Sequence, residues 1–227
     1  MPYLPAALQP ESSPEARAAE PRASSAAAAP APRLARPGFL REVGIYVGRI
    51  RLFTPTDWAV YLSWVGLMFG LVFATGGFLL VGHLNGVRYP LEAWLLPIGA
   101  VIFAISIAID TIGHRTIYKE EISKAEGLVH HITIFSGISA CVLLCLAYSL
   151  PGAVWIVAMV MTALSFLYSL IDEAFHWRRY VQADSDRVEM WSHVGILTGH
   201  SILMIAWWWW FFRGYPGVAE TLPYLAF

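Results

Sequence analysis

Five long apolar segments occupy most of the chain after about residue 57. They run roughly over 58–81, 91–112, 128–150, 153–175 and 188–212, with short polar stretches between them. A helix needs about 20 apolar residues to cross the hydrocarbon of a bilayer. Inside that hydrocarbon a helix is the structure that satisfies its own backbone hydrogen bonds within one segment. The pattern predicts an all-α integral membrane protein with five transmembrane helices.

The chain before these segments has a different character. Residues 1–38 are rich in Ala, Pro, Ser and Glu, a composition that cannot bury enough apolar surface to fold, which predicts a disordered cytoplasmic tail. Residues 39–56 mix arginines with large apolar side chains, as in an amphipathic segment that lies at the membrane interface. The transmembrane domain is expected over 57–227.

Composition supports this division. The chain is 57% hydrophobic and only 14% charged, whereas soluble domains carry about 25% charged residues. Its net charge is −1 and it has no basic stripe, which argues against a nucleic-acid partner and leaves the lipid bilayer as the expected surroundings. Cys141 and Cys145 lie four residues apart in one apolar segment, where cysteines usually pack as small hydrophobic residues.

Lysine and arginine predict the orientation in the membrane. They precede the first span and recur between spans 2 and 3 and between spans 4 and 5, while the opposite side offers only Arg88 and Arg213. Basic residues concentrate on the cytoplasmic side of membrane proteins. We therefore expect a protein of an inner or plasma membrane with its N-terminus in the cytoplasm.

Carboxylates and imidazoles cluster at the ends of the apolar segments. They form four pairs with i, i+4 spacing, which places the members of a pair on one helix face. The pairs are Asp110–His114, Glu126–His130, Asp172–His176 and Glu189–His193. Because spans 2 and 4 end, and spans 3 and 5 begin, at the same membrane face, all four pairs are expected at one depth. A single such pair usually caps a helix, but four pairs in register favour a shared site.

The four pairs belong to an internal repeat, over about 91–150 and 153–212. An offset of 62 residues relates Asp110 to Asp172, His114 to His176, and His131 to His193, whereas the glutamates are offset by 63. The counterpart of His193 is therefore either His130 or His131. Two copies of one helical hairpin, packed about a pseudo-twofold axis, predict a four-helix bundle of helices 2–5 with a site at its centre.

The mixture of imidazole and carboxylate indicates metal chemistry. Iron, manganese and zinc take such ligands, and four-helix proteins hold two metal ions with them. We expect two transition-metal ions near the cytoplasmic face, with iron first and manganese, zinc or copper as alternatives. The candidate metal ligands are Asp110, His114, Glu126, His130, His131, Asp172, His176, Glu189 and His193.

Glu173 is a candidate catalytic residue, as a bridging ligand or proton carrier. His200, seven residues after His193, is a candidate for cofactor binding, with a substrate contact, a haem ligand or a core histidine as the other interpretations.

Part of this arrangement, over about 95–212, resembles the C subunit of the particulate methane and ammonia monooxygenases. That family has a helix ending in Asp-x-x-x-His, a loop, and a histidine opening the next helix, and then repeats the plan with Asn-x-x-x-His. The matching residues are Asp110, His114 and His131 in the first set and Asp172, His176 and His193 in the second, where Asp172 replaces the family's Asn. The loops here are longer, and the family's Thr-Pro-Ser-His stretch is missing. The resemblance implies a copper-binding role in a membrane monooxygenase.

These observations lead to one hypothesis and two alternatives. The hypothesis is a membrane-embedded oxidoreductase with a dinuclear metal site, a monooxygenase or oxidase that uses O2 on a lipid, hydrocarbon, carotenoid or quinol. An electron-donor protein or a larger membrane complex is its expected partner. The first alternative is a metal-, haem- or chlorophyll-binding subunit of a larger membrane complex. The second is a protein that transports metal ions or protons.

Overall fold

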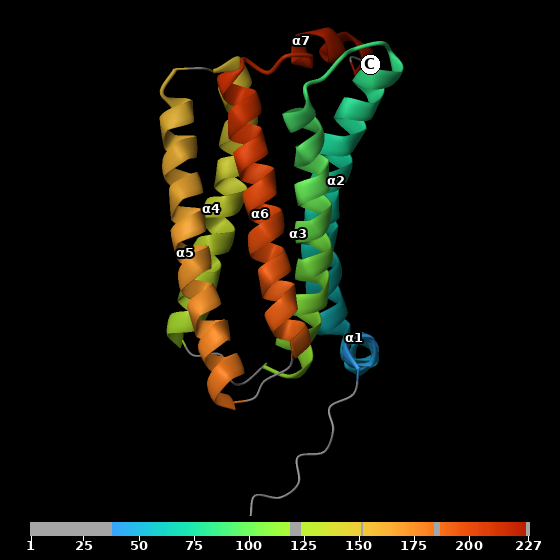
Figure 1. Ribbon diagram of the computed structural model, residues 1–227, viewed down its shortest axis with the longest axis vertical. Coiled ribbons are helices and arrows are strands. Elements are labelled where there is room, and N and C mark those ends of the chain that lie inside the picture. Colours follow the sequence, from blue (N-terminus) through green and yellow to red (C-terminus); the bar gives the residue numbers. More distant parts are fainter. Residues whose placement is uncertain (1–37, 119–123, 151, 184–186, 226–227) are drawn as a thin grey trace, which may run out of the picture. The chain divides into compact units, whose positions relative to one another are not determined.

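The computed structural model describes residues 38–118, 124–150, 152–183 and 187–225, which form helices and turns without a strand among them. The long helices are α2 (Pro55–Leu84), α3 (Leu91–Thr116), α4 (Lys124–Ser149), α5 (Val154–Ala183) and α6 (Arg187–Phe212) (Figure 1). The short ones are α1 (Phe39–Gly48), η1 (Arg49–Leu52), α7 (Val218–Thr221) and η2 (Leu222–Tyr224). The tail expected over 1–38 lies, apart from Gly38, outside the described residues.

The five long helices are each long and apolar enough to cross a membrane, which confirms the predicted all-α fold with five candidate spans. They extend beyond the apolar segments that the sequence outlines. α4 begins at Lys124 instead of near residue 128, and α5 continues to Ala183 instead of ending near residue 175. Helical hydrogen bonding does not require apolar side chains, so the helices continue where the hydrophobic pattern stops. The polar residues near the span ends are therefore held on helices.

The segment before α2 packs across the ends of two long helices. Tyr46 of α1 is 1% exposed and lies in a small apolar cluster with Ile112 of α3 and Val188 of α6. The Nε of Arg187 donates a hydrogen bond to Oε2 of Glu42 (2.8 Å) and ties α6 to α1. This packing fixes the ends of α3 and α6, which carry part of the polar cluster described below.

α2 begins with a capping box. The Thr54 hydroxyl accepts a hydrogen bond from the backbone N–H of Asp57, and the Asp57 carboxylate accepts one from the backbone N–H of Thr54. Pro55 follows as the first helical residue, where its missing N–H costs nothing. Asp57 also accepts a hydrogen bond from Nε of Arg115 (2.8 Å), so the start of α2 is bound to the end of α3.

The long helices pack in two groups. α3 packs mainly against α6 and also contacts α2, whereas α4 packs mainly against α5 (Figure 1). Two glycines bring α3 and α6 close together. A Cβ atom on Gly199 would lie 2.8 Å from the carbonyl oxygen of Gly99, and one on Gly99 would lie 2.5 Å from the backbone nitrogen of Leu203. The close contact of α3 with α6 therefore requires glycine at both positions.

Candidate metal centre

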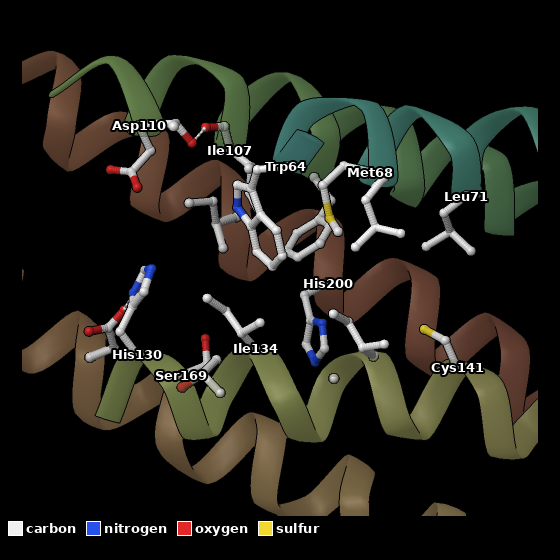
Figure 2. Close-up of a pocket in the computed structure, with 18 of the residues that line it drawn as sticks. Trp64, Met68, Leu71, Ile107, Asp110, His130, Ile134, Cys141, Ser169 and His200 are labelled. Atoms are coloured by element: carbon white, nitrogen blue, oxygen red, sulfur yellow. Dashed lines mark hydrogen bonds and ion pairs between the residues drawn. The ribbon is translucent and has the colours of Figure 1, made fainter. Parts of the chain in front are cut away.

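Carboxylates and imidazoles from four helices gather at the end of the bundle where α3 and α5 end and α4 and α6 begin. The most enclosed of them are ionisable side chains that are at most 6% exposed: Asp110, Glu126, Asp172, His176, Glu189 and His193. Figure 2 shows Asp110 of α3 and His130 of α4 on opposite walls at one end of a cavity. Ionisable groups at this depth of a membrane helix are costly unless they are paired or coordinated, and they usually mark a functional site.

Asp110, His114 and His193 form the first half of the cluster, which we call the α3–α6 group. The Nε2 of His114 lies 3.2 Å from Oδ2 of Asp110, one helical turn before it. The Nε2 of His193 lies 3.0 Å from Oδ1 of the same carboxylate. One aspartate thus lies between two imidazoles, one from its own helix and one from α6.

His130, Asp172 and His176 form the second half, the α4–α5 group. The Nδ1 of His130 lies 3.4 Å from Oδ2 of Asp172. The Nε2 of His176 lies 3.9 Å from Oδ1 of Asp172 and 3.9 Å from Oε1 of Glu126. This group therefore also contains one aspartate between two imidazoles, with Glu126 beside it.

The two groups adjoin. The rings of His176 and His193 stack with centroids 3.5 Å apart, and the ring of His114 lies 5.3 Å from that of His130. One nitrogen from each of His114, His176 and His193 lies within 4.8 Å of the other two, so these three histidines could hold a metal ion after small side-chain shifts. Two atoms that each lie about 2.1 Å from an ion, at about 90–110°, are about 3.0–3.4 Å apart, and the distances in the α3–α6 group fall in that range.

Five candidate ligand atoms of the cluster are buried and make no hydrogen bond among the described residues, although they lie 3.0–3.9 Å from oppositely charged or imidazole atoms of the same cluster. They are Oδ1 of Asp110, Nε2 of His114, Oδ1 of Asp172, Nε2 of His176 and Nε2 of His193. Buried polar atoms without a partner are uncommon because each costs about 1–3 kcal/mol. Five in one place, all of metal-ligand type, form a group that could hold a metal ion.

A second layer of side chains orients the imidazoles. The Nδ1–H of His176 donates to Oε1 of Glu189 (3.0 Å), and Nδ1–H of His193 donates to Oε1 of Glu173 (3.3 Å). Nη1 of Arg179 also lies 3.4 Å from Nδ1 of His176, but two donors cannot bond each other, so the shorter contact to Glu189 places the proton. Each Nε2 then carries a lone pair directed into the cluster. Carboxylates behind the ligand histidines fix their tautomer in the same way in metal sites.

Arg179 joins two of the carboxylates predicted as ligands. Its Nη1 donates to Oε1 of Glu189 (2.9 Å), and its Nη2 bonds Oε1 of Glu126. The guanidinium also lies over the ring of Tyr118, 5.0 Å from its centroid. The sequence-based interpretation did not assign Arg179 to the site, although its place three residues after His176 puts it on the same helix face. Glu126 and Glu189 therefore lie at the cluster but face an arginine.

Two other predicted residues line the same cavity, but no ion pair links them to the carboxylates of the cluster among the described residues. His131 is exposed, and its Nδ1 lies 2.5 Å from the carbonyl oxygen of Gly127 on its own helix. Of the two neighbouring histidines that the repeat left open, His130 is thus the one that enters the cluster. His200 is buried farther along α6, where its Nε2 lies 3.1 Å from Oγ of Ser165.

A cavity of about 800 Å³ extends from the cluster along the bundle. Its walls come from α2, α3, α4, α5 and α6 and are mostly apolar, with Trp64, Met68, Ile107 and Ile134 among the labelled side chains of Figure 2. The charged and imidazole side chains of the lining, apart from His200, belong to the end that holds the cluster. Sites for lipophilic ligands have this character, a large apolar space with a few polar groups at one place.

Comparison of the chain with protein-family models, with curated proteins and with solved structures finds no match. The resemblance to the monooxygenase C subunit therefore stays a prediction, and the candidate function rests on the geometry of the site.

Proposed function

We propose that the chain is a membrane-embedded oxidoreductase that uses two metal ions and O2 to oxidise a lipophilic substrate. The observation that carries the proposal is the meeting of the α3–α6 and α4–α5 groups, each with two histidines and one aspartate, around five buried ligand-type atoms that make no hydrogen bond among the described residues. Two histidines and one carboxylate with open coordination positions are the ligand set of non-haem iron(II) oxygenases. We therefore assign one iron ion to each group.

The balance of charge supports two ions. Five carboxylates line the cluster, from Asp110, Glu126, Asp172, Glu173 and Glu189, and Arg179 supplies one positive charge. With neutral histidines the net charge is −4, which two divalent cations neutralise. Protonation of all four cluster histidines would also neutralise it, but the stacked rings of His176 and His193 would then repel each other at 3.5 Å.

The protein's own groups have separate tasks in this proposal. Glu189 and Glu173 hold the Nδ1 protons of His176 and His193, and Glu173 is 15% exposed at its side chain, so it is the carboxylate placed to exchange a proton. Bound iron supplies the activation of O2. Insertion of one oxygen atom, with reduction of the other to water, consumes two electrons and two protons. An electron-donor protein, a quinol or a larger membrane complex supplies them.

The cavity supports a lipophilic substrate. Lining residues on α2 and α4 are exposed on the helix surface, among them Leu67 (48%) and Val142 (53%). We infer that the cavity opens between α2 and α4 toward the lipid and that the substrate enters there. Its apolar part then lies along the cavity and its reacting carbon at the cluster.

The pseudo-twofold relation and the orientation belong to the same proposal. A twofold axis that exchanges the two hairpins exchanges the α3·α6 pair with the α5·α4 pair, which are the two most extensive helix contacts. It relates Asp110 to Asp172, His114 to His176 and His193 to His130. With the basic residues on the cytoplasmic side, the cluster lies near the cytoplasmic face of the membrane.

The proposal is tested with purified chain, loaded with iron(II) under anaerobic conditions and reconstituted into vesicles with a chemical reductant. Addition of ¹⁸O2 should give O2 uptake and labelled lipid-derived products in mass spectra, and His176→Ala should abolish both. Iron-loaded protein that consumes no more O2 than His176→Ala would contradict the proposal. A Soret or chlorin band in the absorption spectrum, without non-haem iron, would favour a haem- or chlorophyll-binding subunit, and cation flux without oxidation would favour transport.

A further inference from the structure

His200 lies in the wall of the cavity, deeper in the bundle than the metal centre. It follows His193 by seven residues on α6, which is about 10 Å along the helix at 1.5 Å per residue. Figure 2 places it between the end marked by Asp110 and the end marked by Cys141. It is 7% exposed, and it is the imidazole of the cavity wall that lies away from the cluster end.

The surroundings of His200 are aromatic and apolar. The ring of Phe166 meets the imidazole edge-on with centroids 4.6 Å apart, and the ring of Phe103 lies 5.8 Å away. Ser165, which is 0% exposed, is its hydrogen-bonding partner among the described residues. A charged ligand group would find no counter-charge here, so the site suits an uncharged one.

The hydrogen bonds around Ser165 determine which nitrogen of His200 carries the proton. The Ser165 hydroxyl donates its one hydrogen to the carbonyl oxygen of Thr162 (2.8 Å). Its contact with Nε2 of His200 (3.1 Å) is therefore one in which the imidazole N–H donates and the serine oxygen accepts. A neutral imidazole protonated at Nε2 has its lone pair at Nδ1. Nδ1 has no partner among the described residues and is not sealed off by neighbouring atoms, so it borders the cavity as an acceptor.

We propose that Nδ1 of His200 accepts a hydrogen bond from an uncharged hydroxyl group on the lipophilic molecule that occupies the cavity. Two chemical classes carry such a group, the ring hydroxyl of a quinol and the hydroxyl of a long-chain alcohol. A ketone, a quinone or an ether offers only acceptors and cannot make this bond. The inference rests on the proposed function in taking the cavity as the reactant site. It adds that the hydroxyl is held about 10 Å from the metal centre along the helix axis.

Two matched ligand pairs test the proposal. The full chain, treated with chelator and placed in lipid nanodiscs, is titrated calorimetrically with 1-dodecanol and with its methyl ether. The second pair is 2-decylhydroquinone and 2-decylbenzoquinone, titrated under anaerobic conditions. The hydroxyl-bearing member of one pair should bind about five- to tenfold more tightly than its partner, as one net hydrogen bond provides. The pair that shows the preference identifies the class of ligand.

Variants separate the hydrogen bond from packing. His200→Phe keeps a ring in the wall and should bring the ratio of the two affinities close to one. Ser165→Ala should also lower the ratio, because Nε2 then no longer has the acceptor that fixes its proton. Ser169→Ala, one turn farther along α5, is the matched control and should keep the ratio. A native ratio near one, or a ratio unchanged in both His200→Phe and Ser165→Ala, overturns the proposal.

The titrations use protein from which the chelator has removed metal, so the measured preference for a hydroxyl does not depend on the metal centre. If the chain binds no metal, the preference for the hydroxyl still measures the role of His200. If the preference is missing, the metal content of the untreated chain still tests the proposed function.

Discussion

His130 and His193 occupy corresponding places on α4 and α6, each six residues after the first residue of its helix, and each faces the aspartate of another helix. The distance is 3.4 Å from His130 to Asp172 and 3.0 Å from His193 to Asp110. Each half of the cluster thus combines candidate ligands from two helices, one from each hairpin. The site forms only when both hairpins are packed together.

The neighbouring histidines His130 and His131 provide a matched pair for metal binding. His130→Ala removes a ligand of the α4–α5 group and should lower the metal content by about one ion per chain. His131→Ala, at the exposed neighbouring histidine that bonds its own helix backbone, should leave it unchanged. Elemental analysis of the purified variants measures both. An equal loss in both, or a loss confined to His131→Ala, would count against the assignment.

Glu189→Gln tests the carboxylate behind His176. The amide binds the Nδ1–H less strongly and no longer fixes the imidazole, so metal affinity should fall by about 10- to 100-fold. Competition with a chelator of known affinity measures the change. Glu220→Gln, at an exposed glutamate on α7, is the control and should have no effect. Unchanged affinity in Glu189→Gln would show that Glu189 serves the protein fold alone.

Arg179→Met should destabilise the folded protein. It leaves Glu126 and Glu189 without their shared cation while both stay enclosed, and loss of one partner from a buried charge pair costs about 3–5 kcal/mol. The side chain of Arg179 is 16% exposed, so an effect near the lower figure is expected. Thermal unfolding in detergent provides the measurement. The control is Arg178→Met, because Arg178 is exposed and bonds Gln182 of its own helix; equal melting temperatures would contradict the role of Arg179.

Gly199→Ala should weaken the contact of α3 with α6. The added methyl group would lie 2.8 Å from both the Gly99 carbonyl oxygen and Cα of Phe103, and these backbone atoms cannot move separately from their helix. Overpacking of this kind costs about 1–3 kcal/mol, and it should also displace His193 from Asp110 and lower metal content. Gly77→Ala on α2 meets nothing within 4 Å and should be neutral or stabilising. If Gly199→Ala melts no earlier than Gly77→Ala, the close packing is not required.

The five spans and the gathering of the carboxylate–imidazole pairs at one end could be predicted from the sequence because hydropathy and i, i+4 spacing are local properties. The sequence could not predict which of the two neighbouring histidines, His130 or His131, faces the cluster. Neighbouring residues on a helix point about 100° apart, and the rotation of α4 is set by its packing on α5. The hydrogen bonds of Arg179 to Glu126 and Glu189 could not be predicted from the sequence either, because 53 and 10 residues separate the partners and no periodicity relates them.

The metal content of the purified chain tests the central claim most directly. Protein produced with iron, manganese, zinc and copper available, and purified without chelator, should contain two transition-metal ions per chain, with iron in excess. The metal content of the His176→Ala variant should fall below two ions per chain, while the variant elutes from a size-exclusion column as the native protein does. A folded native chain with no stoichiometric transition metal would contradict the account.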